Sequence, residues 1–121
     1  MKILGIETSC DETSVAFVHC SGGIRAPKFK VVQNIVSSQI AVHRPFGGVV
    51  PNLAKREHLK NLPVVLRQIF EATRKLRKQN PLVASGQWLD VDLIAVTVGP
   101  GLEPALWTGI NFAQQLRSSL T

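Results

Sequence analysis

Two short apolar runs, at residues 3–6 and 15–18, open the chain and enclose a polar stretch. The stretch between them, residues 7–14, contains no aliphatic or aromatic side chain. Apolar runs of this length, bounded by turn-forming residues, are typical of strands buried in a sheet. The pattern therefore predicts a β-hairpin with strands near residues 2–7 and 13–19 and a polar tip between them.

A third strand is predicted near residues 29–37, where β-branched residues are frequent, and it would complete an antiparallel meander. Between residues 52 and 78 apolar residues recur at intervals of three and four, which predicts a helix beginning near Pro51. The predicted apolar face consists of Leu59, Leu62, Leu66, Ile69, Phe70, Thr73 and Leu76. Pro63 lies inside this pattern and is expected to kink the helix or split it into two.

The second half of the chain predicts one more strand and one more helix. Asn80-Pro81 should end the long helix, and residues 82–89 read as a loop. The nearly continuous apolar run near residues 91–97 predicts a central strand that is buried on both faces and parallel to its neighbour. After the turn Gly99-Pro100-Gly101, a helix should begin near Leu102. Small residues in its apolar stripe, which consists of Leu102, Ala105, Leu106, Gly109, Ile110, Ala113 and Leu116, would allow close approach to the sheet.

The predicted order is thus β, β, β, α, β, α. Three antiparallel strands followed by a helical crossover to a parallel strand make a mixed sheet of the α/β class, with helices outside it. At 121 residues the chain is expected to form one domain or less, over residues 1–121.

Composition narrows the class of protein without choosing a function. With 45% hydrophobic and 18% charged residues the chain is an ordinary globular sequence, and its net charge of +6 favours anionic partners. Its two cysteines, Cys10 and Cys20, form no C-x-x-C pair, so a reducing cytoplasm is expected. We expect no signal peptide, because no charged n-region is followed by an apolar h-region, and no membrane partner, because no apolar stretch is long enough to span a bilayer.

The polar tip and the glycine turn are the two stretches with candidate chemistry. Hydroxyl groups in the tip, which could donate to phosphate oxygens, belong to Thr8, Ser9, Thr13 and Ser14. Asp11 and Glu12 add carboxylates of the kind that a Mg²⁺–phosphate site uses. The alternative is an ordinary solvated turn, and the tip's composition alone does not decide between the two. Gly99-Pro100-Gly101, a turn from a strand into a helix, is a common ligand-facing device but a weak motif by itself.

Three stretches together resemble one protein family. The first is Met1–Ser14, with the run Glu-Thr-Ser-Cys-Asp-Glu-Thr at residues 7–13. The second extends from Ser38 to His58 and contains Gly-Gly-Val-Val-Pro at residues 47–51, and the third covers residues 96–109. Their content and spacing resemble the TsaD family of tRNA threonylcarbamoyladenosine synthases, historically called sialoglycoprotein endopeptidases or glycoproteases.

The resemblance implies an actin-like, sugar-kinase-like ATPase fold with two lobes, of which this chain would be an incomplete first lobe without the second. Members of the family transfer threonylcarbamoyl from its adenylate to N6 of the adenosine beside the anticodon of tRNA. The implied cofactors are one metal ion, iron or zinc, and a nucleotide or threonylcarbamoyl adenylate. The implied partners are tRNA and, in bacteria, TsaB-like and TsaE-like proteins.

Site residues follow from the same resemblance. Asp11 and Glu12 would position the acyl adenylate or assist proton transfer. The residues implied to bind substrate or nucleotide are Thr8, Ser9, Cys10, Gly99, Pro100 and Gly101. A second hypothesis, that Cys10 is a nucleophile that carries the acyl group, is less favoured than a binding role for this residue. His43 and His58 match the second motif, and we expect them to hold the Gly47-Gly48 loop by hydrogen bonds.

The chain also departs from the family pattern. Asn52 and Lys55 stand where members usually have Glu and Ser, which puts an acidic role there in doubt, and Pro104 stands where members often have Gly. The metal-binding His-x-x-x-His is not found, so we expect no metal site in this chain and no transfer activity from the chain alone. Alternatives are a non-catalytic TsaB-like partner or scaffold protein, a sugar-kinase-like ATPase, and an inactive truncated product. The run Ser9–Glu12 argues against the hypothesis of a TsaB-like protein, and the second motif argues against the hypothesis of a sugar-kinase-like ATPase.

Overall fold

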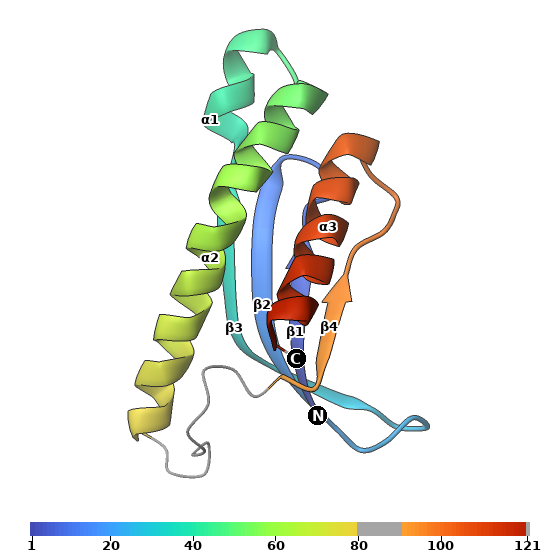
Figure 1. Cartoon of the computed structure of the whole chain (residues 1–121), viewed down its shortest axis with the longest axis vertical. Coiled ribbons are helices and arrows are strands. Elements are labelled where there is room, and N and C mark those ends of the chain that lie inside the picture. The colour runs from blue at the N-terminus through green and yellow to red at the C-terminus, as the bar shows by residue number, and fades with distance from the viewer. Residues whose placement is uncertain (80–90, 121) are drawn as a thin grey trace.

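The computed structural model describes residues 1–79 and 91–120, which form a mixed β-sheet and two long helices (Figure 1). In chain order the elements are β1 (Lys2–Glu7), β2 (Glu12–Ser21), β3 (Lys28–Ser38), α1 (Ile40–His43), η1 (Arg44–Phe46), α2 (Pro51–Gln79), β4 (Leu93–Val96) and α3 (Glu103–Leu120). The predicted strands and helix starts agree with these bounds to within a few residues. The short helices α1 and η1 were not predicted, because they are too short to show a helical hydrophobic pattern. The expected helix end at Asn80-Pro81 and the loop at 82–89 lie outside the described residues.

The sheet confirms the predicted α/β topology. Its strand order is β3-β2-β1-β4. β1 pairs with β2 and β2 with β3 in antiparallel register, whereas β1 and β4 are parallel. Antiparallel neighbours can be joined by short turns, but a parallel pair needs a long crossover, which here contains α2.

Both long helices cover the same face of the sheet (Figure 1). Leu4 and Ile6 of β1 alternate toward this face, as do Val15 and Phe17 of β2, and all four are buried. They pack with the buried side chains of Leu62, Val65, Leu66, Ile69 and Ala113. Burying one side chain of this size contributes roughly 1.5–3 kcal/mol, so this layer fixes the helices on the sheet.

The long helix differs from its prediction in two respects. α2 is one continuous helix with Pro63 inside it, so the expected split does not occur. Pro63 lies on the exposed side, while Leu62 and Leu66 on either side of it remain packed in the core. Leu59, expected on the buried face, is 56% exposed, whereas Val65 is buried. The buried stripe therefore includes Val65 and not Leu59, which lines an open groove between α2 and α3.

The last strand also corrects an expectation. Over the described residues β4 is an edge strand and not a central one. It has only four residues, and Leu93 and Ala95 are exposed, so it is not buried on both faces. The reason is that the described helices cover a single face of the sheet. The parallel pairing of β4 with β1 is confirmed.

Candidate active site

The β1–β2 turn and the glycine turn before α3 are packed directly on each other. The backbone N–H of Leu102 donates to the carbonyl oxygen of Ser9 at 2.8 Å. A Cβ placed on Gly101 would lie 2.6 Å from that oxygen and 2.8 Å from Ser9 Cβ. Only glycine permits this approach, so the sequence of the turn is explained by its contact with the tip. Gly99, Pro100 and Gly101 are all exposed, and the Gly99–Pro100 peptide is cis.

Thr8 ties the tip to α3. Its side chain is fully buried, and its hydroxyl donates to the carbonyl oxygen of Ala105 at 2.7 Å. A Cβ on Gly109 would collide with this hydroxyl, which confirms the predicted close approach of the small-residue stripe.

Three of the four tip hydroxyls are used inside the protein. Besides the Thr8 bond, the hydroxyl of the fully buried Thr13 lies 2.7 Å from His58 Nδ1. Ser14 donates to the side-chain oxygen of Asn34 at 3.0 Å. In this structure the hydroxyls of Thr8 and Thr13 are buried and bonded within the protein, and the expectation that they donate to a ligand phosphate stays a prediction. Ser9 is the remaining member of the set at the tip.

Glu7 is a site residue that the sequence analysis missed. It ends β1, beside the end of the parallel strand β4, and its carboxylate accepts hydrogen bonds from Ser9 N at 2.7 Å and from the hydroxyl of Thr97. Burial raises the pKa of Glu7, but the hydrogen bonds from Ser9 and Thr97 outweigh it, so the pKa lies below its usual value. The carboxyl ends of parallel strands are where α/β proteins place ligand sites, and this position was the available signal.

A second missed residue, Gln39, joins the two histidines of the second motif. Gln39 and both histidine rings are buried. His43 Nδ1 lies 3.2 Å from the N–H of Val50 and must accept, so the proton sits on Nε2, which donates to Gln39 Oε1 at 2.8 Å. The amide nitrogen of Gln39 lies 3.2 Å from His58 Nδ1. His43 thus holds the loop around Gly47-Gly48, as expected.

His58 has a different role from the one expected. Its Nε2 lies 2.9 Å from the carbonyl oxygen of Cys10, which can only accept, so Nε2 carries the proton. Nδ1 then accepts from Thr13 and Gln39. Burial lowers the pKa of His58, and the Cys10 carbonyl and the nearby Glu7 and Asp11 carboxylates oppose this only in part. His58 is therefore neutral at pH 7 and holds the hairpin tip, not the glycine loop.

The remaining predicted residues lie on the tip itself. Burial and the Asp11 carboxylate raise the pKa of the Cys10 thiol above its usual value, which disfavours the thiolate that a nucleophile needs. Asp11 is half-buried, and its backbone carbonyl accepts from Gln39 N at 2.8 Å. Glu12 is exposed at the start of β2, opposite Ser38. The catalytic roles of Asp11 and Glu12 stay predictions.

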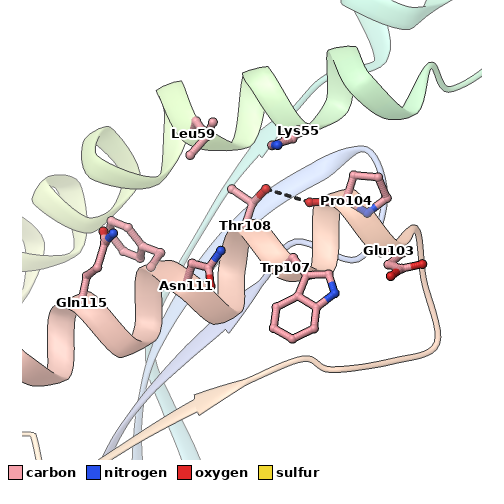
Figure 2. A pocket seen from close by; sticks show the side chains of 9 residues that line it. Lys55, Leu59, Glu103, Pro104, Trp107, Thr108, Asn111 and Gln115 are labelled. Carbon is pink, nitrogen blue, oxygen red and sulfur yellow. Dashed lines mark hydrogen bonds between the residues drawn. The ribbon is translucent and has the colours of Figure 1, made fainter.

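Next to this site, α2 and α3 enclose a groove of about 430 Å³ (Figure 2). Lys55 and Leu59 line it from α2, and Pro104, Trp107 and Asn111 line it from α3. Trp107 is 52% exposed. The groove is mainly apolar and presents no cluster of catalytic groups.

The described part of the chain holds neither a candidate metal cluster nor a helix that could cross a membrane. Within residues 1–79 and 91–120, no three side chains of His, Cys, Asp or Glu gather in a way that could hold a metal ion. The residues present therefore do not fit the metal that the resemblance implies. Neither of the long helices, over these same residues, is apolar enough to cross a membrane.

Comparison with known proteins decides the family. The model of the TsaD family, tRNA N6-adenosine threonylcarbamoyltransferase, matches residues 30–121. This chain belongs to the TsaD family. Among similar proteins of that same name, the one from Thermosipho africanus is 47% identical over 96% of this chain and 29% of its own length. The one from Thermosipho melanesiensis is 45% identical over 99% of this chain and 31% of its own length. The one from Aromatoleum aromaticum is 41% identical over 99% of this chain and 30% of its own length.

The resemblance inferred from the three motifs is thereby confirmed at the level of the TsaD family. The chain spans about 30% of the length of these TsaD relatives. The motifs that carry the family assignment are also those that meet in the structure, since the first and third motifs contact each other at Ser9 and Gly101. The first and second motifs contact each other at Cys10 and His58.

Proposed function

We propose that this chain is the N-terminal part of a tRNA N6-adenosine threonylcarbamoyltransferase, forming a portion of the first lobe of an actin-like fold. The observation that carries the proposal is the contact of the hairpin tip with the Gly99–Gly101 turn, in a chain 47% identical to an enzyme of that name. The half-buried tip and the exposed residues Gly99–Gly101 lie at the carboxyl ends of β1 and β4, where a nucleotide phosphate would be bound.

In the proposed reaction the N6 amine of a tRNA adenosine attacks the carbonyl carbon of threonylcarbamoyl adenylate. A new N–C bond forms, the C–O bond to the adenylate phosphate breaks, and AMP leaves with the bonding electron pair. The amine loses one proton, which Asp11 or Glu12 would accept or guide to solvent. Because the described residues do not gather a metal site, no step is assigned to a metal. TsaB-like and TsaE-like proteins are the proposed partners in bacteria, and the cytoplasm is the proposed compartment.

The proposal is tested in a chimera that joins residues 1–121 to the remaining sequence of the Thermosipho africanus relative. The assay follows modified adenosine in tRNA supplied with threonylcarbamoyl adenylate and partner proteins. Asp11→Ala and Glu12→Ala should each lower the rate on the order of a hundredfold, as loss of a positioned polar group at a reacting centre does. Asn52→Ala, an exposed residue of α2, is the control and should change the rate far less. An active chimera that tolerates Asp11→Ala would contradict the assigned roles.

A further inference from the structure

One segment of the chain is basic and free of acidic residues. No aspartate or glutamate occurs between Glu12 and Glu57. Six of the 14 basic residues fall inside this segment, so residues 13–56 carry a net charge of +6. The other eight basic residues balance the eight acidic ones over the rest of the chain, although residues 57–79 alone, with six basic and two acidic residues, carry +4.

The structure divides these six residues into two clusters. The hairpin cluster, on the β2–β3 turn and the first residues of β3, consists of Arg25, Lys28 and Lys30. The loop cluster, on η1 and the first turns of α2, consists of Arg44, Lys55 and Arg56. All six side chains are exposed. Within the described ranges, none of the six forms an ion pair with a carboxylate.

The loop cluster also carries an exposed aromatic ring, since Phe46, two residues after Arg44, is 66% exposed. Phe29 is 64% exposed, but it alternates with Lys28 and Lys30 along β3 and therefore lies on the opposite face of the strand from them. An exposed aromatic side chain beside basic residues is the arrangement with which proteins stack bases and hold phosphates of unpaired RNA. An acidic protein partner would explain the charges but not the ring of Phe46.

The two clusters lie at opposite ends of β3 (Figure 1). β3 has 11 residues, and at about 3.3 Å per residue the separation is roughly 35 Å. A nucleotide or an acyl adenylate is far too short to reach both clusters, whereas an RNA helix with its loop is long enough. The loop cluster is near the candidate active site, because α2 begins beside the hairpin tip that His58 holds.

From this we propose that residues 13–56 form a bipartite RNA-binding surface, in which the hairpin and loop clusters contact one extended RNA. The inference rests on the proposed function in taking that RNA to be the tRNA substrate. The loop cluster would hold the RNA near the reacting adenosine, and the hairpin cluster would hold the same molecule about 35 Å away. Phe46 would stack on an unpaired base or on the end of the helix.

The test measures binding of a fluorescent anticodon-arm stem-loop RNA to the 121-residue chain over a range of salt concentrations. The test variants are Lys28→Gln/Lys30→Gln and Lys55→Gln/Arg56→Gln. The control is Lys60→Gln/Arg67→Gln, which removes the same charge from exposed positions of α2. Circular dichroism checks that each variant is folded. Each test pair should weaken binding about tenfold, and should flatten the slope of log K against log salt by roughly 1.5–2, as expected for two lost phosphate contacts.

Two further measurements identify the ligand class. Phe46→Ala should weaken binding roughly tenfold while leaving the salt slope unchanged, since stacking does not release counterions. A short single-stranded RNA that reaches only one cluster should be bound more weakly. Its affinity should also change less in either of the two double variants. Equal losses in test and control pairs would overturn the proposal, since net charge alone would then explain binding. Equal binding of polyglutamate, with the same variant dependence, would overturn it in favour of an acidic protein.

The chimera separates this inference from the proposed function. In an active chimera, Lys28→Gln/Lys30→Gln should raise the KM for tRNA about tenfold and leave kcat unchanged. An active chimera in which this double variant leaves the KM for tRNA unchanged would overturn the proposed RNA-binding surface but leave the proposed function intact. A chimera that shows no transfer, while the 121-residue chain still binds RNA with the expected variant dependence, would contradict the proposed function and support the surface.

Discussion

His58 Nε2 donates a hydrogen bond to the carbonyl oxygen of Cys10 at 2.9 Å, although the two residues are 48 positions apart in sequence. This bond ends a buried chain of hydrogen bonds that begins at Val50 N–H and passes through His43 and Gln39. These hydrogen bonds hold the second motif against the hairpin tip, which the first motif forms. The position of the tip backbone is therefore set by the side chains of two buried histidines and one buried glutamine.

Replacing Gln39 should destabilise the fold, because Gln39 stands in the middle of this series of hydrogen bonds. Gln39→Met keeps the volume but leaves His43 Nε2–H without its partner and removes one donor to His58 Nδ1. A buried polar group left unpaired costs about 1–3 kcal/mol, and we expect a loss of this size in the free energy of unfolding. Urea denaturation measures it. Gln68→Met, at an exposed position of the same helix as His58, is the control and should change stability by less than about 0.5 kcal/mol.

The neutral state of His58 makes stability depend on pH. Its pKa lies below the ordinary value of 6.5, so in acid the unfolded chain binds a proton before the folded one does. The free energy of unfolding should then be constant above pH 6.5 as far as this residue is concerned, and should fall as the pH drops from 6.5 through the folded pKa. Urea denaturation between pH 7.5 and pH 5 measures the fall.

A matched pair of variants assigns that pH dependence. His58→Gln removes the titrating ring and should flatten the decrease below pH 6.5, although it lowers stability at every pH. His19→Gln, on the exposed part of β2, should leave the decrease as it is. The ring is faced by Glu7 and Asp11, whose carboxylates raise its pKa, and by His43, which lowers it. An undiminished decrease in His58→Gln would show that another group is responsible.

The contact between the two turns gives a prediction for glycine. Gly101→Ala would place a Cβ 2.6 Å from the carbonyl oxygen of Ser9, so one of the turns must move. We expect a loss of about 1–3 kcal/mol in the free energy of unfolding, as for other overpacked sites. In the chimera the rate should also fall, since the displaced turn borders the site. Gly48→Ala is the control, because nothing lies within 4 Å of a Cβ there and its φ is not positive.

The local hydrophobic pattern of the sequence predicted most of the strands and helices. The features that it failed to predict depend on contacts between residues far apart in the chain. The alternation around Leu4 and Val15 was enough to place two strands, since it follows directly from burial of one sheet face. It could not place Leu59, because the exposed side of α2 depends on where α3 packs. The parallel pairing of β4 was predictable from its apolar run, but its edge position depends on which strands neighbour it.

The same limit applies to the site. The tip was predictable because Ser9 to Glu12 stand in a polar stretch between two strands. The buried bonds of Thr8 and Thr13 were not predictable, since their partners, Ala105 and His58, are far along the chain. Gln39 was missed for the same reason: a glutamine carries no local sign that two histidines will surround it. The charge of the segment 13–56, in contrast, can be read from the sequence alone, and the structure adds its division into two clusters.

Glu7 provides the last prediction, because its carboxylate joins the ends of β1 and β4. It accepts from Ser9 N at 2.7 Å and from the Thr97 hydroxyl. Glu7→Gln keeps the shape but removes the charge and one of the two acceptor oxygens. Hydrogen bonds to a charged group contribute about 1.5–3 kcal/mol, so the variant should lose about 1–2 kcal/mol in the free energy of unfolding at pH 7.

This loss should itself depend on pH in a direction fixed by the Glu7 pKa. The pKa lies below the ordinary value of 4.5, so the contribution of the carboxylate is complete above pH 4.5 and is lost as the pH falls through the folded pKa. The difference between wild type and Glu7→Gln, measured by urea denaturation, should therefore shrink between pH 5 and pH 3. Glu12→Gln, at the exposed start of β2, should show a small difference at every pH. A Glu7→Gln difference that stays constant through this range would mean that the charge of Glu7 does not hold the tip.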